Sequence, residues 1–256
     1  MPELPDLQAF SHNLQKLLAG KQVEKVIVPS KKAHSAEKTM QETLHGQKVS
    51  KVYRSGKELR IAFSKGDVLG LHLMLRGRLH FSNEALHEKG TVLELHFKDG
   101  SSLAMTDFMG AALPTLNPEE PDVPDALELT LDYLKSKLEG TRSSIKNILL
   151  DQHVIRGIGN AYADEILWDA GISPFSVGGK IPADKIKDLQ HSIKTVLTQS
   201  EKTILKTHPD IIAGEVRDFF KIHNARQTTS PGGSEIEIQT NGGRKTYYTA
   251  EQVLYK

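Results

Sequence analysis

The sequence predicts an α+β fold: an N-terminal helix and an antiparallel β-sandwich, then a helical domain and a C-terminal β-hairpin. Three observations support this prediction. Apolar residues recur at helical spacing near the N-terminus, short alternating segments fill residues 22–107, and helical spacing returns after an acidic, proline-rich segment. We therefore expect a β-sandwich domain over 1–116, a linker over 117–125, a helical domain over 126–220 and a terminal hairpin over 221–256.

The N-terminal helix is predicted over residues 3–19, and Gly20 ends it. Its apolar face consists of Leu4, Leu7, Phe10, Leu14, Leu17 and Leu18. The strands of the sandwich are predicted where polar and apolar residues alternate between turn residues. These segments are QVEKVIV, KVSKVYR, ELRIAFS, VLGLHLML, RLHF, VLELHF and SLAMT.

The segment NPEEPDVPD at 117–125 holds three prolines and four acids, so it cannot continue a sheet and is typical of a linker. Helices are predicted after it, near 126–138, 143–151, 160–170, 182–199 and 210–220. The last 36 residues predict a hairpin, because EIEIQT and RKTYYT alternate and the NGG between them favours a tight turn.

Composition places the chain among ordinary globular proteins, with 38% hydrophobic and 25% charged residues over 256 positions. No segment approaches the roughly 18 apolar residues of a membrane span, and the acidic N-terminus is not a signal peptide. We therefore expect a cytoplasmic protein. The chain has no cysteine, which excludes disulfides, thiol nucleophiles and cysteine-ligated zinc.

Charge is unevenly distributed although the formal net charge is only +1. Residues 51–80 carry seven basic and two acidic residues, a net charge of +5, whereas residues 111–140 carry two basic and seven acidic, a net charge of −5. The first stretch can form an anion-binding face. It can equally be a set of scattered solvated charges, and the pattern alone leaves both interpretations open.

A glycine-rich connector near the middle of the chain can bind phosphate. Gly157 and Gly159 precede Asn160, which is predicted to cap a helix that carries Asp164 and Glu165 in its first turns, where acids suit the helix dipole. A glycine turn that opens a helix exposes backbone N–H groups to an anion. On physical grounds alone, a plain helical hairpin is the more common explanation.

Two basic residues lie at predicted turns. Arg244 follows the NGG turn, where a guanidinium can bind a phosphate through two hydrogen bonds. Lys57 follows Gly56 at the entry to a strand in the basic stretch. Taken singly, each is more often a solvated charge than a ligand.

The N-terminus itself can carry chemistry. Initiator methionine is usually removed before a small residue, which would leave Pro2 with a free secondary amine next to Glu3. Such an amine can attack an electrophilic carbon and form an iminium, and α-amino groups titrate near pH 7.7–8.0. The alternative is that Pro2 is an ordinary helix-opening proline.

The order of these motifs resembles the formamidopyrimidine-DNA glycosylase and endonuclease VIII family over essentially the whole chain. The matching segments are PELPDLQ at the N-terminus, GK at 56–57, HLML with RG at 72–77, IKNILLDQHVIRGIGNAYADEILWDAGISP at 145–174 and GGRKTYY near the C-terminus. The resemblance implies a base-excision-repair enzyme that flips out a damaged base, cuts its glycosidic bond and nicks the strand by β-elimination, which δ-elimination can follow. The 145–174 segment resembles the helix–two-turn–helix of that family.

The resemblance implies roles for individual residues. Pro2 matches the nucleophile that attacks C1′, Glu3 matches the acid that protonates the sugar oxygen, and Lys57 matches a lysine that contacts phosphate and aids catalysis. Asn160 and Arg244 match residues that bind the phosphates around the lesion. The other DNA-binding positions implied are His72, Lys146, Gly157 and Gly159.

Family members fill the gap left by the extruded base with a Met, Arg and Phe set. Here the matching positions are Leu75, with Met74 before it, and Phe108, to which Met109 can add. The stretch from Thr106 to Gly110 has no arginine, so discrimination of the opposite base is open. The resemblance leaves the substrate open among oxidised pyrimidines, ring-opened purines, abasic sites and bulkier lesions, all ahead of strict 8-oxoguanine repair.

The family's C-terminal finger often binds zinc through four cysteines, and this chain has none. We expect a zincless finger, held only by hairpin packing of Ile236, Ile238, Tyr247 and Tyr248, with no metal site at His223 and no cofactor. The expected partner is double-stranded DNA with a damaged base or abasic site, bound by a monomer associated with the nucleoid. The alternative is a catalytically weak or inactive damaged-DNA-binding protein of the same fold.

Overall fold

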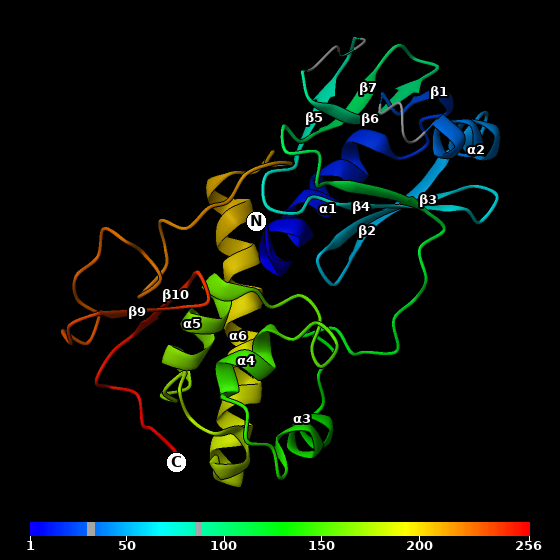
Figure 1. Ribbon diagram of the computed structural model, residues 1–256. Helices are drawn as coiled ribbons and strands as arrows, with labels where there is room; N and C mark the ends of the chain where they lie inside the picture. Colours follow the sequence, from blue (N-terminus) through cyan, green and yellow to red (C-terminus); the bar gives the residue numbers. More distant parts are fainter. Residues whose placement is uncertain (30–33, 85, 87–88) are drawn as a thin grey trace. The chain divides into compact units, whose positions relative to one another are not determined.

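The computed structural model describes residues 1–29, 34–84, 86 and 89–256 (Figure 1). The chain divides into two compact units: Met1–Glu120 with Ile204–Glu215, and Pro121–Thr203 with Val216–Lys256. The first unit passes into the second inside the segment predicted as a linker. The four predicted domain ranges stay a prediction. Within the described residues, every helix is too short or too polar to cross a bilayer.

Helix α1 spans Leu4–Leu18, as the apolar spacing predicts. Glu3 is its N-cap, and Glu3 and Asp6 form a reciprocal capping box in which Glu3 N donates to Asp6 Oδ2 at 2.9 Å. Phe10 and Leu14 of α1 are fully buried in the core of the first unit. The start of the chain is therefore held by both a cap and a buried helix face.

Two four-stranded antiparallel sheets share that core with α1, which confirms the predicted sandwich. One sheet has the order β2-β3-β4-β8, and the other has the order β1-β6-β7-β5. The bounds of the strands are β1 Val23–Ile27, β2 Val49–Ser55, β3 Glu58–Phe63, β4 Val68–His72, β5 Arg78–Ser82, β6 Thr91–Phe97, β7 Ser102–Thr106 and β8 Leu113–Leu116.

The alternating pattern missed two elements of the first unit. Helix α2 spans His34–Leu44, and strand β8 lies at a sheet edge with Pro114 inside it. Pro114 is tolerated there because an edge strand need not donate from every backbone nitrogen. In α2, Met40 and Leu44 are the buried apolar residues, four positions apart, which is too short a pattern to stand out from the neighbouring strands.

Helices α3 Leu131–Leu138, α4 Ile145–Leu150, α5 Asn160–Asp169 and α6 Ala183–Thr207 confirm four of the five predicted helices. A short 3-10 turn covers Gly178–Lys180. The fifth prediction, a helix over 210–220, is wrong. Pro209 follows the end of α6, and Gly214 has a φ of +93°, so the chain turns repeatedly instead of continuing a helix. Ile211 and Ile212 pack against the core of the first unit.

The C-terminal hairpin is present as predicted, with β9 at Glu237–Asn241 and β10 at Arg244–Tyr248. Gly242 and Gly243 form its turn, and both have positive φ angles (+55° and +76°). Such a turn needs residues without a Cβ clash, and its twist matches that of the paired strands. In Figure 1, β10 lies beside α5 in the second unit.

A buried carboxylate of α5 ties this hairpin to the helices. Asp164 is fully buried, and its Oδ2 accepts a hydrogen bond from Tyr247 N at 3.0 Å and lies 2.7 Å from His223 Nδ1. Its Oδ1 lies 2.6 Å from Lys146 Nζ, which also donates to Thr246 Oγ1 at 2.9 Å. One carboxylate thus connects α4, α5 and β10.

The neighbouring carboxylate holds the segment before the hairpin. Glu165 accepts backbone hydrogen bonds from Lys221, Ile222 and His223 at 2.9, 2.9 and 2.8 Å. Burial raises the pKa of Glu165 above its ordinary value, while these three donors act in the opposite direction. The prediction that Asp164 and Glu165 serve the helix dipole is wrong, because α5 begins at Asn160 and turns both side chains toward the hairpin.

The prediction that only packing holds the hairpin is also wrong in part. Ile236 and Tyr247 are buried together with Ile222, and Trp168 packs against them. Ile238, however, is 51% exposed, and Tyr248 meets Phe175 edge-on at a centroid distance of 4.9 Å. The hairpin is therefore held by a small apolar cluster together with the carboxylates of Asp164 and Glu165.

We predict that Asp164→Asn destabilises the second unit by about 3–5 kcal/mol, because it leaves the ammonium of Lys146 buried without a counter-charge. Urea unfolding measures this loss. The double variant Asp164→Asn with Lys146→Met should recover part of it, and Asp188→Asn at an exposed ion pair on α6 serves as the control. Unchanged stability of Asp164→Asn would contradict the anchoring role.

Candidate active site and nucleic-acid interface

The structure separates the predicted site residues into two groups. Pro2, Glu3, Lys57, His72, Met74, Leu75 and Phe108 belong to the first unit, and Lys146, Gly157, Gly159, Asn160 and Arg244 belong to the second. Pro2, Leu75 and Phe108 line a cavity of the first unit, and Lys146, Asn160 and Arg244 line a cavity of the second.

Pro2 lines a cavity of about 580 Å³ in the first unit. Three large apolar side chains, Leu75, Phe108 and Met109, stand at this cavity and are 66%, 83% and 64% exposed. A contiguous group of exposed apolar side chains often marks an interaction site. The cavity is lined by Pro2, Leu75, Arg76, Gly77, Arg78, Thr106, Phe108, Met109, Gly214 and Glu215.

The start of the chain lies at this cavity in a fixed environment. Pro2 is buried, Glu3 is only 4% exposed, and the ammonium of Met1 forms an ion pair with Glu215 Oε1. Glu215 did not stand out in the sequence, because it lies 214 positions after Met1, in a segment that was predicted to be helical.

Lys57 lies in the tight turn between β2 and β3, where Gly56 has a φ of +57°. Arg54 fixes this turn, since its Nη1 donates to Gly56 O and its Nε donates to Gln8 Oε1 of α1, both at 2.9 Å. A turn tied to α1 keeps Lys57 in a defined place relative to the N-terminus.

The pKa of His72, at the end of β4, is affected by the charge of Lys57. Burial lowers the pKa of His72, Lys57 lowers it further, and the carboxylate of Glu58 opposes both. His72 Nδ1 accepts a hydrogen bond from Met74 N at 3.2 Å, so in the neutral ring Nε2 carries the proton. The charge of Lys57 thus acts on His72, whose Nε2–H is left to donate a hydrogen bond.

Leu75 is presented by a tight turn between β4 and β5. Met74 has a φ of +52°, which is uncommon for a residue other than glycine, and Gly77 N donates to Leu73 O at 2.8 Å. A Cβ at Gly77 would lie 2.3 Å from that carbonyl oxygen, so only glycine fits. This turn holds Leu75 outward, whereas Met74 is only 37% exposed.

Phe108 is presented by a second turn, which Asp107 organises. The Asp107 carboxylate accepts from Met109 N at 2.9 Å and from Ala111 N and Ala112 N at 2.8 Å. Burial alone would raise the pKa of Asp107, but these donors and the Arg76 guanidinium outweigh burial and hold it below its ordinary value. Arg76 is exposed and shares the cavity with Phe108. Arg76, which belongs to the turn between β4 and β5, therefore places an arginine at the same cavity as Phe108.

In the second unit, the connector between α4 and α5 is tied by Gln152. Its Nε2 donates to Leu150 O and Ile158 O at 2.9 Å, and its Oε1 accepts from Gly157 N at 3.0 Å. Gly157 has a φ of +103°, so a glycine is required there. The prediction that Asn160 is the N-cap is wrong: Gly159 occupies that position, and Asn160 is the first residue of α5.

Asn160 and Arg244 line one cavity of about 310 Å³. Asn160 Nδ2 donates to Lys245 O at 2.9 Å, which links the start of α5 to β10. An amide nitrogen carries two hydrogens, so it can donate a second bond. Arg244 is exposed beside it.

Lys146 also lines this cavity but is only 5% exposed. Its ammonium is bound to Asp164 and Thr246, as described above. The structure thus gives Lys146 a part in holding the hairpin, and its contact with DNA stays a prediction.

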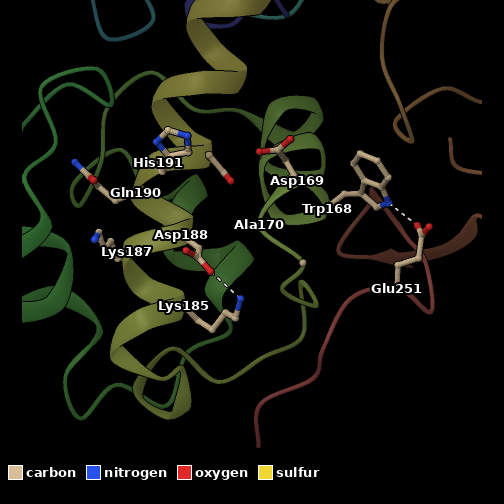
Figure 2. Close-up of a pocket in the computed structure, with 11 residues that line it drawn as sticks. Trp168, Asp169, Ala170, Lys185, Lys187, Asp188, Gln190, His191 and Glu251 are labelled. Carbon is tan, nitrogen blue, oxygen red and sulfur yellow. Dashed lines mark hydrogen bonds and ion pairs between the residues drawn. The ribbon is translucent and has the colours of Figure 1, made fainter. Parts of the chain in front are cut away.

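A further cavity of about 660 Å³ lies elsewhere in the second unit, beside α5, α6 and the C-terminal segment (Figure 2). None of the predicted site residues lines it. Its charged groups are largely paired: Trp168 Nε1 donates to Glu251 Oε2 at 2.8 Å, and Lys185 lies 2.7 Å from Asp188, as the dashed lines in Figure 2 show.

Among the described residues, no three histidine, aspartate or glutamate side chains are grouped to hold a metal ion. His223, the residue weighed for such a site, lies against Asp164 and Tyr247.

We predict that Asp107→Asn lowers stability by about 1–3 kcal/mol at pH 7, because an amide cannot replace a carboxylate that accepts three backbone bonds. The folded pKa of Asp107 is lowered, so this contribution is present above the unfolded pKa and is lost as the pH falls through the folded value. Thermal unfolding of both proteins from pH 7 to pH 2.5 measures it. The gap in Tm should close below about pH 4; a gap independent of pH would contradict this assignment. Asp122→Asn, at an exposed carboxylate, is the matched control.

Comparison with known proteins agrees with this geometry. Residues 1–111 match the formamidopyrimidine-DNA glycosylase N-terminal domain, and residues 120–208 match the formamidopyrimidine-DNA glycosylase H2TH domain. The formamidopyrimidine-DNA glycosylase of Lactobacillus helveticus is 33% identical to this chain, and that of Lactobacillus johnsonii is 31% identical; in both cases the match covers 100% of each chain.

Solved structures show the same fold. The Lactococcus lactis Fpg, solved in complex with DNA containing an abasic site, superposes with a TM-score of 0.86 at 22% identity and covers 98% of this chain and 99% of its own. Together with the two domain matches and the full-length relatives, this shows that the chain belongs to the formamidopyrimidine-DNA glycosylase family.

Proposed function

We propose that this protein is a base-excision-repair DNA glycosylase with AP lyase activity, and that Pro2 is its nucleophile. The observation that carries the proposal is the cavity of the first unit, where the buried Pro2 lies next to exposed Leu75 and Phe108. A reactive amine beside side chains suited to enter a base stack fits an enzyme that extrudes a base and attacks its sugar.

The chemistry follows from a secondary amine. Once Met1 is removed, the lone pair of the neutral Pro2 nitrogen forms a bond to C1′ of the damaged nucleotide and the bond from C1′ to the base breaks. The proton that remains on the nitrogen passes to the departing base. Glu3 donates a proton to the sugar ring oxygen as the ring opens, which leaves an iminium at C1′. The iminium acidifies the C2′ proton, so loss of that proton expels the 3′ phosphate, and a second elimination can release the 5′ phosphate.

Lys57 and His72 are suited to bind the phosphates next to the attacked sugar. Lys57 supplies a positive charge, and the neutral His72 ring supplies an N–H from Nε2, the nitrogen not used by Met74. In the second unit, Asn160 and Arg244 supply donors to the backbone further along the strand. Contacts of this kind position a protein on DNA without reading its sequence.

Leu75 and Phe108 are proposed to fill the space that the extruded base leaves, with Met109 beside them. Arg76 lies at the same cavity and carries donors for the unpaired base on the opposite strand. Arg76 thus takes the role of hydrogen bonding to the opposite base, for which the stretch from Thr106 to Gly110 has no arginine.

Structures of the Lactococcus lactis enzyme hold DNA with an abasic site, with Fapy-dG and with an oxidised pyrimidine. We propose that this protein acts on the same three classes, as a monomer and without a metal in its C-terminal finger. We also propose a cytoplasmic location with association to the nucleoid, where such lesions arise.

A second function, binding of damaged DNA without excision, is favoured by one observation: the stretch from Thr106 to Gly110, which presents Phe108, has no arginine. Excision also requires that Met1 has been removed. A protein that keeps Met1 has the Pro2 nitrogen in an amide and cannot form the iminium. Intact-mass measurement of the native protein distinguishes the two functions.

We predict that Pro2→Gly lowers borohydride trapping and nicking of abasic DNA by about 100-fold, because the ring that fixes the amine is lost. Pro5→Ala is the matched control, since Pro5 is a nearby proline in the first turn of α1 and does not line the cavity. If both variants trap as well as the parent, Pro2 only opens the helix and the proposed mechanism is wrong.

We predict that Asn160→Ala and Arg244→Ala each weaken binding to all duplexes by about 10-fold, regardless of sequence. Arg244→Ala should also reduce the slope of log K against log salt by about 1, whereas Asn160→Ala should leave it unchanged. Fluorescence anisotropy at several salt concentrations measures both effects. Lys187→Ala, at an exposed lysine of α6, is the control. A loss confined to one sequence would contradict phosphate binding.

A further inference from the structure

A carboxylate from a distant part of the chain reaches the N-terminal amine. Glu215 Oε1 pairs with the ammonium of Met1, and the two side chains are 38% and 28% exposed. Pro2, Gly214 and Glu215 line the same cavity. No motif in the sequence singled out Glu215.

The segment that carries Glu215 is fixed against α1. Residues Ile204–Glu215 belong to the first unit although most of α6 belongs to the second. Asn13 Nδ2 of α1 donates to Ile211 O at 2.9 Å, and Ile211 and Ile212 pack on the core that α1 shares. Gly214, with its φ of +93°, then turns the chain so that Glu215 meets the terminus. The carboxylate and the start of α1 are therefore parts of one framework.

Covalent geometry brings this carboxylate within reach of the reactive nitrogen. Three bonds separate Met1 N from Pro2 N, so the two nitrogens lie at most about 3.7 Å apart. Glu215 is hydrogen-bonded to the first, so it lies within roughly 7 Å of the second before any movement. When Met1 is removed, the terminal charge passes to the Pro2 nitrogen, which lies within this distance of the same carboxylate.

We propose that, in the mature protein, Glu215 binds the Pro2 ammonium and accepts its proton before attack. The proton moves from the Pro2 nitrogen to a Glu215 carboxylate oxygen, which gives a neutral secondary amine and a carboxylic acid. The freed lone pair then forms the bond to C1′, and the base leaves as described. This inference rests on the proposed function, because it assigns a proton acceptor to the same nucleophile.

Other charged groups also lie near the Pro2 amine and limit how far Glu215 alone sets its protonation. Arg76 and Arg78 line the cavity from the β4–β5 turn and from β5, and the carboxylates of Glu3 and Asp6 lie at the start of α1. Asp6 is engaged with Glu3 N in the capping box, and Glu3 is assigned to the sugar oxygen. Glu215 is the carboxylate that the structure pairs with the terminal ammonium itself.

The test is single-turnover borohydride trapping on abasic duplex from pH 6 to pH 9 with the parent, Glu215→Gln and Asp210→Asn. Asp210 is an exposed carboxylate of the same segment that does not line the cavity. Intact mass confirms that each protein has lost Met1. Binding to a duplex with a reduced, unreactive abasic analogue checks that the DNA site is intact.

We expect Glu215→Gln to trap about 10- to 100-fold more slowly than the parent at pH 6.5. The difference should shrink toward pH 9, because solvent then removes the proton from the amine. Asp210→Asn should follow the parent throughout, and binding to the unreactive analogue should change less than about twofold.

Two results would overturn the inference: equal rates at pH 6.5, or a loss of the same size at every pH, which would indicate a structural role. A parent protein that lacks Met1 and still traps no abasic DNA would instead overturn the proposed function, and the assignment of Glu215 with it.

Discussion

An N-terminal amine can act as a reagent only if the residue that carries it is held still, and α1 provides that constraint. Chain termini usually fray, yet here Pro2 is buried, Glu3 and Asp6 cap the helix reciprocally, and Phe10 is fully buried in the core. The turn of Lys57 is tied to the same helix through Arg54. The functional geometry of the first unit therefore depends on how firmly the first turn of α1 is held.

In the second unit, carboxylates that accept backbone hydrogen bonds hold the C-terminal hairpin in place. A short hairpin has too little apolar surface to stay folded alone, and this one leaves Ile238 in water. Asp164 and Glu165 compensate by accepting hydrogen bonds from β10 and from the segment before it, and Lys146 balances the charge of Asp164. A buried charge without such partners would be strongly destabilising. Arg244 can therefore stand at the tip of a hairpin that is anchored at its base.

The sequence was informative where a pattern is local. Alternation predicted the sandwich strands, helical spacing predicted α1, and the glycines of NGG predicted the turn between β9 and β10. It was misleading where tertiary contacts decide. Asn160 is a good capping residue, yet Gly159 is the N-cap of α5, and the Asn160 side chain donates to Lys245 O of β10 instead. Glu215 lay in a segment whose spacing favoured a helix, and only the folded chain brings it to Met1.

The most direct measurement is the location of the covalent bond. The protein is trapped with borohydride on an abasic duplex, digested with a protease, and the peptide bearing the sugar remnant is sequenced by mass spectrometry. The account predicts a peptide that begins at Pro2, lacks Met1 and carries the remnant on its terminal nitrogen. A remnant on a lysine such as Lys57, or on the amine of a retained Met1, would contradict it.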